Sequence, residues 1–198
     1  MAIAVGGKTV RGAAVDGVAP HLLSAATGHH SLVLAPSQVP DKTSEIPIVA
    51  ELLADLREAG HELTAMVCGA LHAQHRTAKL LHQQTAGYVL TVKGNQPTLL
   101  ATVQDRLRSP RATGTPQRSR GHGRAEQRSL SVAPADGINF PGTAQAFRLT
   151  RHTGHLEGQR TGTEVVYGIT NLSAEQAILS GSSPPIRGHW SIENRLHC

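Results

Sequence analysis

Aromatic residues and cysteines are scarce in this sequence, and each shortage narrows the kind of protein that it encodes. Phe, Trp and Tyr together make up 3% of the 198 residues, so a buried core has to be built mainly from Leu, Val, Ile and Ala. The two cysteines, Cys68 and Cys198, lie far apart and repeat no spacing. The sequence therefore indicates neither a disulfide framework nor a cysteine-rich zinc site.

Long apolar runs are also missing. No run approaches the roughly 20 apolar residues that a membrane helix needs, and the N-terminus has no apolar segment followed by a signal-peptide cleavage site. We therefore expect a cytoplasmic protein with no membrane partner. Because 198 residues without an internal repeat suit a single domain, we expect one, with a core made of residues 1–109 and 171–198.

Positive charge is what the chain has in excess. The formal net charge is +5, and seven arginines stand against one glutamate between Arg106 and Arg128. Gly and Pro interrupt this segment, so we expect it to be flexible. Guanidinium groups bind phosphate oxygens whatever the base sequence, which makes nucleic acid the natural partner. A solvated linker in a basic protein is the alternative that this segment alone leaves open.

Short apolar runs bounded by turn residues predict an antiparallel meander near the N-terminus. The first strand is expected to stop in a tight turn at Gly6-Gly7, and Asp16-Gly17 has the sequence of a hairpin turn. The expected strands are residues 2–5, 10–15, 21–26 and 31–35. From Ser44 to Gly60, apolar residues are spaced along one helical face, which predicts a helix.

After this helix the pattern alternates between strand and helix, which favours parallel strands joined by crossover helices. The expected elements are a strand at 63–68, a helix at 74–84, a strand at 87–92 and a helix at 98–108. Residues from about 110 to 170 contain alternating segments separated by Gly and Pro, which predicts a β-rich insertion.

The last twelve residues predict a short helix. If it begins at about His189, then His189, Glu193 and His197 lie along one face. Glu193 is thereby directed to a defined place. The alternative is a solvated carboxylate that bridges to a His or Arg of the same helix.

Two other site patterns fail on their spacing. Ala2 followed by Gly7-Lys8-Thr9 satisfies a loose phosphate-loop pattern, but the intervening residues are the apolar strand itself rather than a Gly-rich loop. His72 and His75 suggest zinc, yet no third and fourth ligands follow at a recognisable spacing. We therefore expect neither a nucleotide site nor a zinc site.

Six sequence blocks, taken in order, support a specific match. They are residues 3–12, 42–47, 69–74, 92–97, 121–126 and 187–197. Together they resemble the DDE transposases of bacterial insertion sequences, in the group that includes the H-repeat-associated proteins. The resemblance implies an α/β fold of the ribonuclease-H-like kind, with a mixed sheet, flanking helices and a β-rich insertion. It also implies a function in DNA transposition.

In that family, three carboxylates hold two magnesium ions, which cleave and transfer DNA strands. The resemblance places the first Asp at Gly6, the second at Gly69 and the Glu at Glu193. Glu193 is then the one catalytic and metal-binding residue carried over, because glycine has no side-chain oxygen. We therefore expect an inactive copy that binds magnesium poorly, and the blocks at both ends suggest that it is also truncated.

The resemblance further implies double-stranded DNA as the partner, namely the terminal repeats of an insertion sequence. The residues expected to contact DNA are Lys8, Arg11, Lys93, Asn95, Arg118, Arg120, Arg124, Arg187, His189 and Arg195. For Lys93 and Asn95, turn formation at a strand-to-helix junction is an equally good interpretation. A non-catalytic DNA-binding remnant is the alternative function, and the oligomeric state stays open, with a homodimer among the options.

Overall fold

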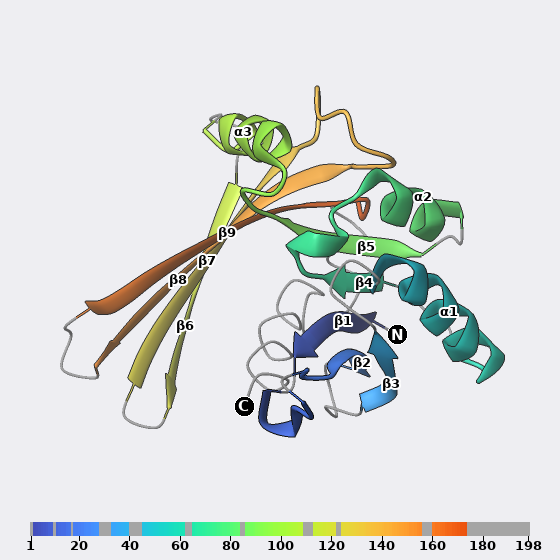
Figure 1. Cartoon of the computed structure of the whole chain (residues 1–198). Helices are drawn as coiled ribbons and strands as arrows, with labels where there is room; N and C mark the ends of the chain where they lie inside the picture. Colours follow the sequence, from blue (N-terminus) through green and yellow to red (C-terminus); the bar gives the residue numbers. More distant parts are fainter. Residues whose placement is uncertain are drawn as a thin grey trace.

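The computed structural model of the chain forms a twisted sheet with helices against it (Figure 1). The structure describes residues 2–9, 11–16, 18–27, 33–39, 45–61, 65–83, 86–108, 113–121, 124–155 and 160–173. The terminal helix expected around Glu193 lies outside these residues.

The described strands belong to one nine-stranded sheet, in the order β3-β2-β1-β4-β5-β9-β8-β7-β6. They are β1 (Ala2–Thr9), β2 (His21–Thr27), β3 (Val33–Val39), β4 (Ala65–Cys68), β5 (Gly87–Val92), β6 (Thr113–Gly121), β7 (Arg124–Pro134), β8 (Gln145–His155) and β9 (Arg160–Thr170). β1, β4 and β5 are parallel, whereas β2 pairs antiparallel with β1 and β3. This confirms the N-terminal meander, the parallel strands and the ribonuclease-H-like α/β fold.

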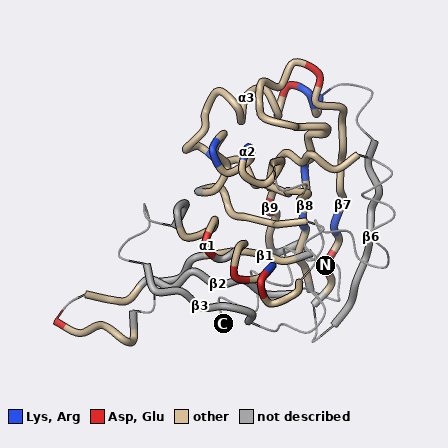
Figure 2. Tube along the Cα trace, turned by 90° about the vertical axis from the view of Figure 1, so that its right-hand side faces the viewer, with Lys and Arg blue, Asp and Glu red and all other residues tan. Residues whose placement is uncertain are grey.

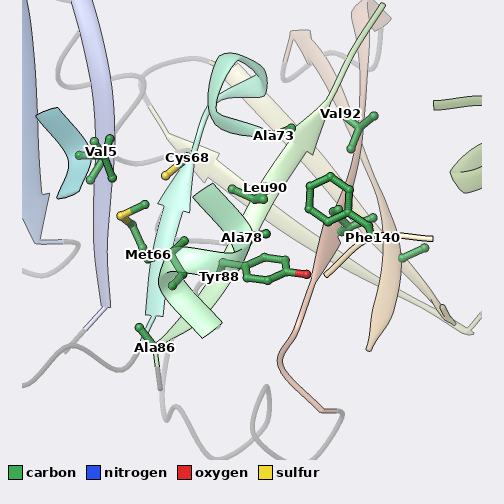
Figure 3. Packing of buried hydrophobic residues seen from close by; sticks show 14 of the residues in the cluster. Val5, Met66, Cys68, Ala73, Ala78, Ala86, Tyr88, Leu90, Val92 and Phe140 are labelled. Atoms are coloured by element: carbon green, nitrogen blue, oxygen red, sulfur yellow. The ribbon is translucent and has the colours of Figure 1, made fainter. Parts of the chain in front are cut away.

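Three helices pack on one face of the sheet, here called the first face. They are α1 (Glu45–Glu58), α2 (His75–Gln83) and α3 (Pro97–Arg106). Leu53 of α1, Leu81 of α2 and Val103 of α3 are fully buried in one cluster with side chains of β1, β4 and β5. Figure 3 shows the strand side of that cluster, including Met66 and Leu90. None of the described helices is long and apolar enough to cross a membrane.

The stop of α1 follows the prediction from Gly60. This glycine has a φ of 81°, a left-handed conformation that costs other residues free energy. Its N–H donates to the Arg57 carbonyl, and the His61 N–H donates to the Leu56 carbonyl, both at 2.9 Å. These two bonds satisfy carbonyls that the helix end leaves without partners.

β1 does not stop at Gly6-Gly7, so that prediction is wrong. The strand continues to Thr9 because Gly6 and Gly7 pair with Ser24 and Leu23 of β2, and a backbone ladder needs no side chain. Residues 11–13 then form a 3₁₀ helix instead of part of a strand. Because residues 7–9 are strand, they form no phosphate-binding loop.

The Arg-rich segment is also not the flexible stretch that its Gly and Pro residues suggested. Most of it is a hairpin, in which β6 pairs with β7 from Thr113↔Val132 to Gly121↔Arg124. β7 pairs with β8 along its whole length as well. The sequence of β6 has no apolar alternation of its own. It forms a strand because β7 pairs with it.

A network of hydrogen bonds joins the start of β5 to the end of β9. The Tyr88 N–H donates to Asn171 Oδ1, and the Thr170 hydroxyl donates to the Tyr88 carbonyl, both at 2.6 Å. The Tyr88 hydroxyl, visible in Figure 3, donates to the Pro141 carbonyl at 2.6 Å and lies 2.8 Å from Thr143 Oγ1. Burial raises the pKa of Tyr88 to about 12, although the bond with Thr143 opposes this shift.

Tyr88→Phe should lower the free energy of unfolding by about 1–2 kcal/mol at neutral pH, because the Pro141 carbonyl loses its donor. Tyrosine ionises near pH 10.0 in the unfolded chain and near 12 in the folded one, so the unfolded chain releases this proton first. The contribution of Tyr88 is therefore full below pH 10 and is lost between about pH 10 and 12. Urea unfolding of both proteins from pH 7 to 11 measures this. The difference between them should shrink above pH 10, and a difference that stays constant would contradict the burial argument.

Candidate functional site

Three residues form a row, here called the strand-end row, at the position where the pairing of β1 with β4 ends: Gly6 within β1, Gly69 after β4 and Thr91 near the end of β5. The row follows from the strand register, in which the preceding pairs are Val5↔Cys68 and Cys68↔Leu90. Gly69 continues the extended backbone of β4, with φ −65° and ψ 171°. Neighbouring strands lie about 4.8 Å apart, so side chains at adjacent positions of this strand-end row are within reach of one another.

The strand-end row belongs to the second face of the sheet, opposite the helices. Val67 and Val89 form a buried cluster on this second face with Phe147 and Leu149 of β8. Side chains at alternate strand positions share a face. Positions 69 and 91 come two residues after Val67 and Val89, so both lie on the second face too. The two positions that the resemblance assigns to catalytic Asp are thus neighbours on one face.

Neither glycine of the strand-end row is required by the backbone. A Cβ added at Gly6 or Gly69 meets nothing within 4 Å, and neither residue has a positive φ. Gly168 of β9, which pairs with Thr91, is different. A Cβ there would come within 2.2 Å of Phe147 Cζ and 2.5 Å of the Leu90 carbonyl oxygen. Gly168 is a packing glycine, whereas Gly6 and Gly69 have room for a side chain.

We expect Gly168→Ala to lower the free energy of unfolding by about 3 kcal/mol or more, because the Phe147 ring and the β5 backbone cannot both move aside. Gly6→Ala and Gly69→Ala are the matched controls in neighbouring strands. Each should change stability by less than about 1 kcal/mol, since both sites are open and extended. Chemical denaturation of the three variants measures these free energies of unfolding. Equal decreases at all three positions would contradict the distinction between the packing glycine and the two open glycines.

Thr91, the third member of the strand-end row, is a buried polar residue that the sequence patterns did not single out. It is 3% exposed, and its Oγ1 has no hydrogen-bond partner among the described residues. The signal was weak because Thr91 lies in an apolar strand in which every residue is buried. Only the register with Gly69 shows its place in the site.

The turn after β5 carries two of the predicted DNA-contacting residues. Lys93 and Asn95 are both exposed. Asn95 Nδ2 donates to the Ala70 carbonyl at 2.9 Å, and Gln96 Nε2 donates to the Ala73 carbonyl at 3.0 Å. These bonds tie the turn to the segment that follows Gly69, so Asn95 has a structural role whether or not it contacts DNA.

The other predicted DNA-contacting residues are spread over the chain. Lys8 lies in β1, Arg11 in the 3₁₀ helix, Arg118 and Arg120 in β6, and Arg124 in β7. Outside the described residues are Glu193, Arg187, His189 and Arg195. The structure therefore brings Gly6 and Gly69 together, and the place of Glu193 beside them stays a prediction.

The four strands β6 to β9 have faces of different charge. On the first face, His152 lies opposite Gln127 and Arg148 lies opposite Ser131. Arg148 Nη2 donates to Ser131 Oγ at 3.3 Å, and His152 Nδ1 lies 2.9 Å from Thr163 Oγ1. By register, positions 118 and 120 of β6 also belong to this face. In the described parts of the four strands, no carboxylate occupies it.

The second face of the same strands holds their carboxylates in ion pairs. Glu126 Oε1 accepts a hydrogen bond from Arg128 Nε and forms an ion pair with Arg151 Nε at 2.8 Å. Arg151 Nη1 also lies 3.7 Å from Glu164 Oε2. Lys and Arg recur along β7 and β8 (Figure 2), but those paired with Glu126 are already neutralised. Arg148 on the first face, by contrast, has no carboxylate beside it among the described residues of these strands.

Metal-binding side chains do not gather in the part of the chain that the structure describes. No group of three or more His, Cys, Asp or Glu residues there is arranged to hold a metal ion. His72 is buried, whereas His75 is exposed and its ring packs edge-on against Phe140 at a centroid distance of 4.7 Å. The two histidines thus have different environments, and the strand-end row has no carboxylate.

Two Escherichia coli proteins are similar in sequence to nearly the whole chain. Over 98% of its length, the chain is 30% identical to "Putative protein YbfL" and 29% identical to "H repeat-associated putative transposase YhhI", both of Escherichia coli strain K12. The chain spans 54% of each of these relatives, about half their length. No family model matches the chain.

A solved structure, the cryo-EM structure of a piggyBac transposase synaptic complex with hairpin DNA, aligns with 99% of this chain and 39% of that chain, at 10% identity. The TM-score of this superposition is 0.47. The sheet order itself defines an α/β protein of the ribonuclease-H-like fold. Over 98% of its length the chain is similar to a protein named as an H repeat-associated putative transposase, which confirms the resemblance drawn from its six blocks.

Proposed function

We propose that this chain is a transposase relative that binds double-stranded DNA without cleaving it. Gly6 and Gly69 carry the proposal. They occupy neighbouring positions where the pairing of the parallel strands β1 and β4 ends, and a pair of carboxylates there would hold metal ions. Both positions have room for a side chain, so packing does not explain the glycines.

The described residues do not fit a pair of magnesium ions. Magnesium takes hard oxygen ligands, and Gly6 and Gly69 supply no side-chain oxygen. The hydroxyl of Thr91 is neutral and a much weaker ligand than a carboxylate. Glu193 alone, if it reaches the strand-end row, leaves the second ion without a protein ligand. Strand cleavage through two metal ions therefore has no support in these residues.

Wild-type protein should not nick duplex DNA that carries the terminal repeats flanking its gene, at any magnesium concentration up to about 10 mM. Gly6→Asp/Gly69→Asp restores the two carboxylates and should bind magnesium measurably by calorimetry. Gly12→Asp/Gly94→Asp adds the same charge at two other open glycines and is the control. Magnesium-dependent nicking by the wild-type chain would overturn the proposed loss of cleavage.

DNA binding is proposed to use the first face of β6 to β9. Arg148 and His152 lie there among Ser and Thr hydroxyls, and the described strands place no carboxylate on that face. Duplex DNA carries a phosphate every few ångströms, so such a face attracts it without reading bases. The Arg-rich hairpin adds positions 118 and 120 to the same face. On the second face, Glu126 and Glu164 oppose such an approach.

Arg118→Gln/Arg120→Gln should weaken binding to a short duplex about tenfold or more at roughly 0.1 M salt. It should also reduce the salt slope by about one for each phosphate that is no longer neutralised. Arg76→Gln/Lys79→Gln removes the same charge from exposed residues of α2 and should have little effect. Fluorescence anisotropy at several salt concentrations measures both. Equal losses for the two double variants would mean that net charge alone governs binding, and would sink the proposed face.

A further inference from the structure

We propose that Thr91 is a positioning residue for a carboxylate at position 69, and that its unpartnered hydroxyl is what remains of that pairing. The inference rests on the proposed function only in taking position 69 as a former carboxylate site. Of the three residues in the strand-end row, Thr91 is the one whose side chain carries an oxygen.

The geometry of β4 and β5 supports this pairing. Cys68 lies opposite Leu90, and the extended backbone at Gly69 carries the same register one residue further, to Thr91. Paired positions on parallel strands face the same side, about 4.8 Å apart. A carboxylate one methylene beyond the Cα at position 69 can reach a hydroxyl on its neighbour. Gly6 is two strands away from Thr91, at roughly twice that distance.

The state of the Thr91 hydroxyl is the second observation. Oγ1 is buried and has no partner among the described residues, whereas the buried hydroxyl of Thr170 donates to the Tyr88 carbonyl at 2.6 Å. A buried hydroxyl without a partner is destabilising, and most native hydroxyls avoid this state. At Thr91 the neighbouring space is open, since a Cβ at Gly69 meets nothing within 4 Å. The hydroxyl that lacks a partner therefore lies next to the open space at position 69.

The chemistry of the pair is a charge-assisted hydrogen bond. A threonine hydroxyl donates to one carboxylate oxygen and leaves the other free for a cation. This fixes the orientation of the carboxylate before any metal binds. Because the bond favours the ionised form, it should also lower the pKa of the carboxyl group.

A double-mutant cycle in the full chain tests the pairing without DNA or metal. In the wild-type background, Thr91→Val should leave the folding equilibrium constant unchanged or raise it, because it replaces an unpartnered hydroxyl with an apolar group of the same shape. In the Gly69→Asp background, the same change should lower that constant about tenfold. Thr91→Ser keeps the hydroxyl and should lower it by less than about threefold. Urea unfolding at pH 7 in EDTA gives each constant.

Two further measurements separate a specific hydrogen bond from general damage. The pKa of the carboxyl introduced by Gly69→Asp, followed by NMR, should rise when Thr91→Val is added and return with Thr91→Ser. Gly6→Asp is the matched control, and Thr91→Val should leave that carboxyl unaffected. Equal effects of Thr91→Val in the wild-type and Gly69→Asp backgrounds would refute the pairing. That outcome leaves the proposed DNA binding and loss of cleavage standing, because neither enters the cycle.

Discussion

Hydrogen bonds around Tyr88 hold the edge of the parallel strands to β9, and through β9 to the other three long strands. The backbone of Tyr88 contacts Asn171 and Thr170, and its hydroxyl contacts the loop that leads into β8. β5 therefore has a strand on both sides, and its position is fixed from both. Since Thr91 is on β5, three residues along from Tyr88, the strand-end row inherits this rigidity. The Phe147 ring packed over Gly168 closes the row on the β9 side.

The two faces of this continuous sheet divide the chemistry of the molecule. The first face holds the three helices over β1, β4 and β5, and further out it presents arginine, histidine and hydroxyl groups on β7 and β8. The second face holds the strand-end row and the ion pairs of Glu126. Because strand alternation fixes which residue belongs to which face, a shift of one residue in β7 would bring Glu126 to the first face, where Arg148 and His152 of β8 lie. The register of β7 with β8 thus determines that Glu126 lies on the second face, away from Arg148.

The sequence predicted those parts of the fold whose signals are local. The helix ending at Gly60, the strand from Gly87 to Val92 and the alternation around them all follow from periodicity and turn residues. The range 110–170 was predicted to be β-rich, as the structure has it, but β6 within it was expected to be flexible because its own sequence has no apolar alternation and its pairing comes from β7. The extension of β1 through Gly6-Gly7 was missed for a related reason. Two glycines signal a turn, but here β2 supplies backbone partners for both.

For the candidate site, the resemblance located Gly6 and Gly69, but it gave no information about space or partners. The adjacency of the two positions comes from the pairing of β1 with β4, and the openness of both comes from their surroundings. Thr91 belongs to no motif, and only the register with Gly69 and its unpartnered hydroxyl distinguish it from other strand threonines. Sequence motifs therefore identified the two glycine positions, whereas the structure identified their adjacency, their open space and Thr91.

The proposed loss of two carboxylates also bears on stability. Two ionised carboxylates about 5 Å apart repel each other by roughly 3 kcal/mol at an effective dielectric constant near 20, until a cation or a proton relieves the repulsion. A chain with glycine at both positions folds without that penalty and without dependence on metal. It loses instead the hydrogen bond that Thr91 can offer, whose net value is smaller. Under the proposed loss of the two acids, the repulsion that the metal-free fold avoids is therefore larger than the hydrogen bond that it forgoes.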